Sequence, residues 1–158
     1  MKNMTQIAVM LGGNLPGTEN AMAEALRKFS VAGVQNITVS NIVKSAAEDC
    51  VPGTPDFLDM AFTGSWQGSA EELLRLCQKI EIAAGRPEIH SSRESRILDC
   101  DIIFFGEMHC NSPHLTIPHP RAHLRRFVLE PLAEIIPDMR FADGKTVKDV
   151  LAGLPSVE

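Results

Sequence analysis

Two aspartates separated by one residue, Asp99 and Asp101, interrupt an otherwise apolar run at residues 97–105. In a β-strand, residues i and i+2 point to the same face, so both carboxylates leave the strand on one side, with Cα atoms roughly 6.6 Å apart. Two carboxylates at that distance repel each other unless a cation lies between them. Oxygen ligands of this kind suit Mg²⁺, which takes one or two carboxylates together with substrate phosphates and water. An exposed sheet edge, or an aspartate paired with an arginine, explains the same spacing equally well.

Positive charge and histidine concentrate around this aspartate pair. The chain has a formal net charge of −5, but residues 86–126 contain all five histidines, six arginines and only five acidic residues. That segment therefore carries a charge of +1 and the remainder carries −6. A net negative chain is not expected to bind nucleic acid non-specifically. A basic segment around two carboxylates favours an anion held together with a metal, and a solvated basic face is the alternative.

Two other ligand patterns are incomplete. Gly12 and Gly17 have the spacing of a phosphate-binding G-x-x-x-x-G-K-[ST] loop, but Thr18 stands where the lysine belongs, so these glycines indicate a turn. Imidazole and thiolate groups, the usual ligands of zinc, also gather in one short stretch. These residues are His109, Cys110, His114 and His119. Their spacing matches no structural zinc pattern, and two prolines break the stretch into turns.

Hydrophobic periodicity predicts the elements that must position these residues. Strands are expected at 6–11, 37–43, 57–62 and 97–105, with a tight turn at Gly12 and Gly13. One helix is capped by Thr18, and a second begins with the capping box of Ser69 and Glu72. The resulting order predicts an α+β fold, a ferredoxin-like βαββαβ sandwich with a mainly antiparallel sheet. Helical runs at 127–136 and 147–154 predict additional C-terminal helices, and 158 residues suit a single domain, 1–158.

The cysteines and the hydropathy pattern predict the compartment. None of the four cysteines forms a C-x-x-C pair, which fits a reducing environment. No stretch approaches the roughly 20 apolar residues of a membrane span, and no signal-peptide pattern opens the chain. A cytoplasmic protein that binds no membrane is therefore expected.

Three segments carry a family resemblance. Residues 96–106, RILDCDIIFFG, resemble the R-x-[LI]-D-[LIV]-D-[IL] strand of the hydroxymethyl-dihydropterin pyrophosphokinases. Residues 118–137 are similar to the second signature of that family. Residues 12–15, GGNL, resemble its G-S-N-L turn, with Gly13 in place of serine. The three segments span most of the chain in the order of the family.

The resemblance implies a reaction and a set of site residues. Family members transfer pyrophosphate from ATP to the hydroxymethyl group of 6-hydroxymethyl-7,8-dihydropterin in folate biosynthesis and release AMP. They use two Mg²⁺ ions, and a monomer is expected. The implied catalytic residues are Arg86, Arg96, Asp99 and Asp101, of which Asp99 and Asp101 are the metal ligands. The implied ATP-binding residues are Arg96, Ile102, Thr116, His119 and Arg125, and the pterin-binding residues are Phe57, Asp59 and Phe127.

The chain also departs from the family pattern near the expected substrates. The threonine–proline segment of the family appears as residues 45–49, SAAED, and Asp59 replaces an asparagine that reads the pterin edge. Glu88 replaces an arginine, and Arg93 replaces a tryptophan. Besides an active pyrophosphokinase, two alternatives stay open: a divergent homologue that uses ATP and Mg²⁺ with another acceptor, and a non-catalytic protein that binds pterin or nucleotide.

Overall fold

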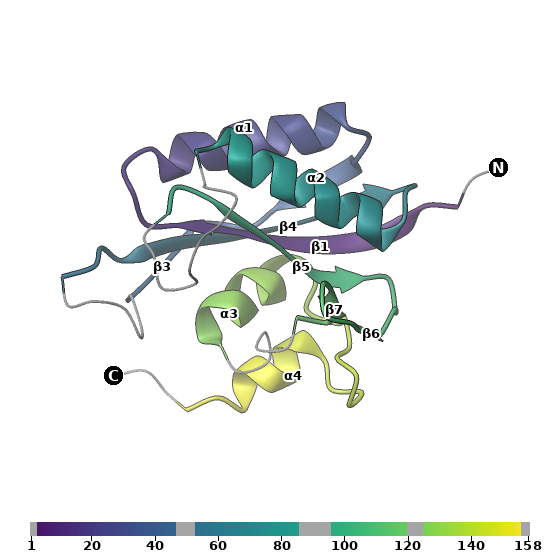
Figure 1. Ribbon diagram of the computed structural model, residues 1–158. Helices are drawn as coiled ribbons and strands as arrows, with labels where there is room; N and C mark the ends of the chain where they lie inside the picture. The colour runs from purple at the N-terminus through teal and green to yellow at the C-terminus, as the bar shows by residue number, and fades with distance from the viewer. Residues whose placement is uncertain (1–2, 47–52, 86–95, 120–124, 156–158) are drawn as a thin grey trace.

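The computed structural model describes residues 3–46, 53–85, 96–119 and 125–155, and shows a sheet with helices on both faces (Figure 1). Helices α1 and α2 cover one face, α3 lies against the other, and α4 packs against α3. The elements, in chain order, are β1 (Thr5–Gly13), α1 (Thr18–Val31), β2 (Gln35–Val39), β3 (Val43–Ser45), β4 (Phe57–Trp66), α2 (Ala70–Ala83), β5 (Asp99–Phe105), β6 (Cys110–Asn111), β7 (Thr116–Ile117), α3 (Arg126–Ile135) and α4 (Val147–Ala152).

The main sheet has the strand order β2-β4-β1-β5, and β3 also pairs with β4. Every pair in it is antiparallel. The mixed fold with a mainly antiparallel sheet is thus confirmed. The strand predicted at 37–43 is two short strands, which pair with different halves of β4: Gln35 lies opposite Ser65, and Ser45 lies opposite Phe57. The separate β6–β7 hairpin was not predicted.

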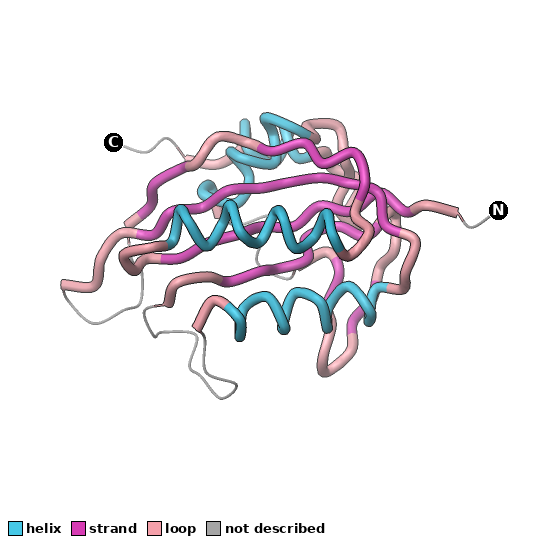
Figure 2. The backbone as a smooth tube through the Cα atoms, turned by 90° about the horizontal axis from the view of Figure 1, so that it is seen from above, coloured by secondary structure: helices cyan, strands magenta, loops and turns pink. Residues whose placement is uncertain are grey.

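Each face of the sheet has its own hydrophobic core. In Figure 2, α1 and α2 lie in front of the sheet and run roughly along the strands. Beneath them lies the first core, which includes Leu11, Phe62 and Leu98. The second core lies on the face of α3 and α4 and includes Met10 and Leu129. The side chains of β1 alternate between the two cores, as the period of two in a strand requires. None of the helices formed by the described residues has the length and hydropathy needed to cross a membrane.

The turn between β1 and α1 differs from its prediction. Strand β1 continues through Gly13, and the helix cap is Gly17, whose φ of 96° is the left-handed conformation that glycine adopts readily. Thr18 is therefore the first helical residue rather than the cap. Its hydroxyl donates to the carbonyl oxygens of Leu15 at 2.9 Å and Ile97 at 2.8 Å. The predicted capping box at the start of α2 is confirmed by both of its hydrogen bonds.

Candidate active site

Two aspartates from different strands flank a glycine at one end of the sheet. Gly12 of β1 lies opposite Asp59 of β4 on one side and opposite Asp99 of β5 on the other. Residues directly opposite each other in a sheet point to the same face, and neighbouring strands are 4.7–4.9 Å apart. The two carboxylates therefore leave the same face from Cα positions about 10 Å apart.

Gly12 keeps the space between these aspartates open. A Cβ atom built on Gly12 would lie 2.8 Å from Oδ1 of Asp59. Any side chain at this position would displace the carboxylate or occupy the gap between the two acids. The row of Asp59, Gly12 and Asp99 thus depends on the missing side chain.

Asp101, two residues after Asp99 on β5, points to the same face of the sheet. We call the surface formed by Asp59, Asp99 and Asp101 the acidic face. Asp101 lies opposite Met10 and is exposed, whereas the side chain of Asp99 is 17% exposed. Leu98, Cys100 and Ile102 point into the first core, as the alternation predicts. Because the side chain of Ile102 is buried there, this predicted ATP-binding residue is available to a ligand only through its backbone.

Arginine side chains pair with the acids and with two aromatic rings. Arg96 forms a hydrogen-bonded ion pair through Nε with Oδ2 of Asp99. Its guanidinium carbon also lies 4.9 Å from the ring centroid of Phe57. Arg125, just before α3, lies 5.5 Å from the ring centroid of Phe127. Both contacts are within cation–π range, so each predicted pterin-stacking ring carries a guanidinium on one side.

Asn14, which we did not predict as a site residue, holds three segments of the site together. Its backbone N–H donates to the carbonyl of Arg96 at 2.9 Å, and its Oδ1 accepts from the N–H of Arg96 at 2.9 Å. Its Nδ2 donates to the carbonyl of Pro55 at 3.2 Å. The side chain is buried at 5% exposure. The GGNL segment indicated a turn, but sequence spacing gave no sign of its partners 41 and 82 residues away.

Asp59 is a buried acid with a hydroxyl partner. It is 7% exposed, and its Oδ2 accepts a hydrogen bond from Oγ of Ser45 at 3.0 Å. Burial raises the pKa of Asp59 to about 6, although the Ser45 bond and the charges of Arg96 and Arg125 act to lower it and Asp101 raises it further. The two arginines and Asp101 therefore lie within electrostatic reach of Asp59.

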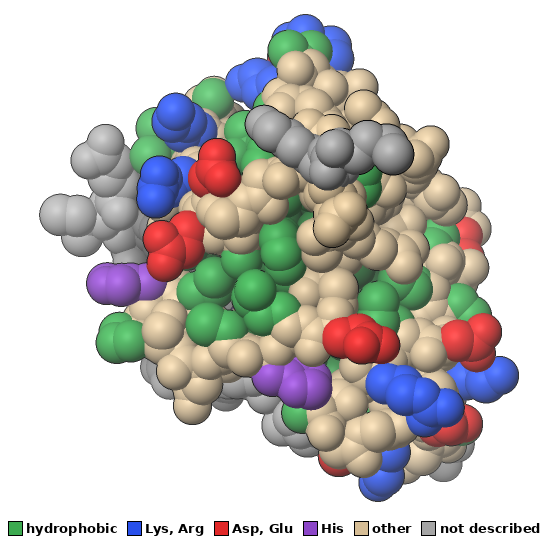
Figure 3. All heavy atoms as spheres, turned by 90° about the vertical axis from the view of Figure 1, so that its right-hand side faces the viewer, with side chains coloured by type: hydrophobic (Ala, Val, Ile, Leu, Met, Phe, Trp, Pro, Cys, Tyr) green, Lys and Arg blue, Asp and Glu red, His purple; other side chains and the backbone are tan. Residues whose placement is uncertain are grey.

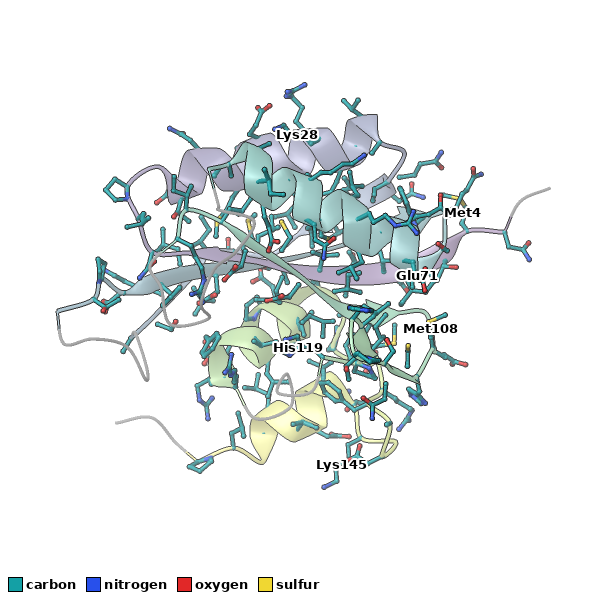
Figure 4. All side chains as sticks on the ribbon, in the orientation of Figure 1. Met4, Lys28, Glu71, Met108, His119 and Lys145 are labelled. Carbon is teal, nitrogen blue, oxygen red and sulfur yellow. The ribbon has the colours of Figure 1, made fainter. Side chains whose placement is uncertain are left out.

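The remaining predicted site residues lie on other elements. Thr116 is in β7, and His119 follows that strand on the side of the sheet that faces α3 (Figure 4). Both are half-buried. Arg86, Ala47, Glu88 and Arg93 lie outside the described residues. Within the described ranges, no three His, Cys, Asp or Glu side chains are grouped to hold a metal, so the cluster considered for zinc is not formed there.

The surface at the opposite end of the sheet has a different composition. Figure 3 shows this end, where hydrophobic side chains gather among charges of both signs. Met4 and Met108, which are 36% and 43% exposed, lie there (Figure 4). The aspartates and arginines described above belong to the end where β1 finishes and β4 and β5 begin.

Comparisons with known proteins identify the family of this chain. A family model described as 7,8-dihydro-6-hydroxymethylpterin-pyrophosphokinase (HPPK) matches residues 8–137. A 2-amino-4-hydroxy-6-hydroxymethyldihydropteridine pyrophosphokinase from Synechocystis sp. is 34% identical over 151 residues, which cover 95% of this chain and 75% of that protein. The protein of the same description from Pseudomonas aeruginosa is 31% identical over 157 residues, with 95% and 92% covered.

Larger proteins match over part of their length. This chain corresponds to 27% of a folate synthesis bifunctional protein from Arabidopsis thaliana, at 34% identity over 131 residues. A crystal structure of Plasmodium falciparum HPPK-DHPS with SDX-DHP superposes with a TM-score of 0.74 and 12% identity, covering 96% of this chain and 46% of that one. At that identity the structural match supports the fold alone.

The matches define the class of the protein as a pyrophosphokinase of folate synthesis. The chain belongs to the 7,8-dihydro-6-hydroxymethylpterin-pyrophosphokinase family, because the family model covers most of its length.

The burial of Asp59 predicts a pH-dependent stability. Because its pKa rises from 3.8 to about 6 on folding, the folded state binds more protons than the unfolded state between these values. The contribution of Asp59 to the free energy of unfolding therefore falls as the pH rises from about 4 to about 6. Asp59→Asn lacks this titration, so urea denaturation should show it gaining up to about 3 kcal/mol relative to wild type between pH 4 and pH 7.

The exposed neighbour Asp56 provides the control. Asp56→Asn makes the same chemical change at the surface and shows how much of the effect comes from the amide itself rather than from burial. A pH-independent stability difference between Asp59→Asn and wild type would show that the folded and unfolded states protonate Asp59 alike.

Proposed function

We propose that this chain transfers the pyrophosphoryl group of ATP to the hydroxymethyl group of 6-hydroxymethyl-7,8-dihydropterin at the row of Asp59, Gly12 and Asp99. The observation that carries the proposal is that acids from two strands share one face with Arg96 beside them. Membership of the pyrophosphokinase family supplies the reaction. The strand order β2-β4-β1-β5 also supports a ferredoxin-like sheet as the scaffold.

Asp99 and Asp101 are the proposed ligands of Mg²⁺. Both present carboxylate oxygens on one face, and hard oxygen donors suit this ion. Two carboxylates leave most of its six positions to ATP phosphates and water, which is the usual arrangement for Mg²⁺. Bound there, the metal would neutralise charge on the phosphates during transfer. Two ions are proposed, as the family resemblance implies.

Cationic side chains would bind the triphosphate. Arg96 and Arg125 carry guanidinium groups beside the acidic face, and Arg86 and His119 are proposed to join them. Attack of the pterin hydroxyl oxygen on the β-phosphorus forms the new P–O bond, and the hydroxyl proton passes to solvent. The bond between the β-phosphorus and the oxygen that bridges it to the α-phosphorus breaks, so AMP leaves with that oxygen. Fixed positive groups stabilise the charge that moves to the leaving phosphate. Thr116 and the backbone of Ile102 are proposed to contact the nucleotide.

Phe57 and Phe127 are proposed to stack on the two faces of the pterin, with Asp59 at its edge. Asp59 lies two residues after Phe57 on the same face of β4. An ionised carboxylate accepts hydrogen bonds but donates none. Asp59 can therefore bind the amino group and ring N–H of the pterin, but not the adjacent carbonyl oxygen.

A second candidate function is transfer to another acceptor alcohol. The observation that favours it is the Asp59–Ser45 bond, which occupies one carboxylate oxygen where the family has an asparagine. Because the remaining oxygen accepts but cannot donate, an acceptor with a hydrogen-bond donor and no adjacent carbonyl would suit this edge better than a pterin. The reaction at the phosphates would be unchanged.

Production of AMP tests the metal ligands. Asp99→Ala and Asp101→Ala should each abolish AMP formation from ATP, Mg²⁺ and hydroxymethyl-dihydropterin, because each removes a ligand of the metal that binds the phosphates. Circular dichroism should show that both variants stay folded, since neither side chain lies in a hydrophobic core. Glu107→Ala, at an exposed acid beyond the far end of β5, is the matched control. Near-normal AMP formation by either aspartate variant would remove that residue from the metal site.

Calorimetry at pH 8 tests the pterin edge. Asp59→Asn should change the dissociation constant of pterin, measured with a non-hydrolysable ATP analogue, by less than about tenfold. The reason is that a charge-assisted bond offsets much of the roughly 1–3 kcal/mol cost of an unmade buried hydrogen bond. Asp59→Leu should bind far more weakly, since it leaves both pterin donors unpaired. If wild type binds no pterin and Asp59→Asn restores binding, the natural acceptor is a different alcohol.

A further inference from the structure

Glu81, near the end of α2, contacts the strand that carries both proposed metal ligands. Its Oε2 accepts a hydrogen bond from the backbone N–H of Cys100 at 2.8 Å. Cys100 stands between Asp99 and Asp101, so the bond holds the backbone that links the two carboxylates. The reaction described above gives Glu81 no role.

The position of β5 in the sheet explains why a side chain reaches its backbone. β5 is the last strand in the order β2-β4-β1-β5, so among the described strands of that sheet β1 alone pairs with it. Backbone groups on an outer edge need a partner from outside the strand ladder. Helix α2 lies over this edge, since Cys77, one turn before Glu81, packs in the same core as Cys100. Burial raises the pKa of the Cys77 thiol most, and the charge of Glu81, one turn later on the same helix face, raises it further.

The helix itself does not favour a glutamate at this position. Glu81 lies in the last turn of α2, where negative charge is unfavourable beside the unpaired carbonyl groups of the helix end. That turn contains no basic residue. The hydrogen bond from Cys100 does favour a carboxylate here, since a charged acceptor forms a stronger hydrogen bond to a backbone N–H than a neutral one.

We propose that Glu81 is a positioning residue for the metal–nucleotide site. By fixing the Cys100 backbone, it sets the direction in which Asp99 and Asp101 leave β5. Groups that do not touch the metal but hold its ligands in place by hydrogen bonds strongly affect metal affinity. The inference rests on the proposed function, because it assumes that the two aspartates bind the metal.

The test compares two variants at Glu81. Glu81→Ala removes the acceptor and should weaken binding of Mg²⁺ with α,β-methylene-ATP, measured by calorimetry, roughly 10- to 100-fold. Glu81→Gln keeps an acceptor oxygen and should retain most of the affinity. Amide exchange at Cys100 should speed up in Glu81→Ala and stay slow in Glu81→Gln. Glu71→Ala, at a 78% exposed side chain of the same helix, should behave as wild type.

Each outcome has a separate meaning. Wild-type affinity in Glu81→Ala would overturn the positioning role while leaving the proposed function intact. Equal loss in Glu81→Gln and Glu81→Ala would overturn it as well, because charge rather than the hydrogen bond would then matter. Failure of wild type to bind the metal–nucleotide would overturn the proposed function. If Glu81→Ala does not fold, Glu81→Asp, whose side chain is one methylene shorter, takes its place with the same expected loss.

Discussion

The hydrogen bonds between Asn14 and Arg96 fix the distance between the end of β1 and the start of β5, and the site depends on that distance. The two backbones come so close here that a Cβ on Gly13 would lie 2.0 Å from the carbonyl oxygen of Ile97. Only glycine fits such an approach. The third bond of Asn14, to Pro55, brings the segment before β4 to the same point. One buried amide thus joins the three chain segments that lead into the candidate site.

Repulsion between carboxylates explains why the segments that carry them must be held in place by hydrogen bonds. Asp59, Asp99 and Asp101 share one face, and Asp59 is largely removed from water. Arg96 and Arg125 compensate in part, since both lower the pKa of Asp59, but burial outweighs them and leaves it at about 6. A face that concentrates carboxylates and guanidinium groups without full neutralisation is suited to bind a cation and an anion together. Mg²⁺ with a triphosphate has that composition.

The sequence could predict the arrangement of residues that are close together along the chain. The common face of Asp99 and Asp101, and the core positions of Leu98 and Cys100, follow from a period of two. By contrast, the row that places Asp59 beside Gly12 depends on strand register, which is set by packing across the whole sheet. The same holds for the partners of Asn14, Ser45 and Glu81, which lie far away along the chain. The resemblance to a family placed Asp59 in the site, but only the structure showed that it is buried and hydrogen-bonded.

A crystal structure with Mg²⁺, α,β-methylene-ATP and hydroxymethyl-dihydropterin would show directly whether the aspartates form the substrate site. Mg²⁺ is expected at about 2.0–2.1 Å from carboxylate oxygens of both Asp99 and Asp101. The pterin is expected between Phe57 and Phe127, with its amino edge at Asp59. Metal and nucleotide bound elsewhere, with the three aspartates in contact only with water, would contradict the proposed function.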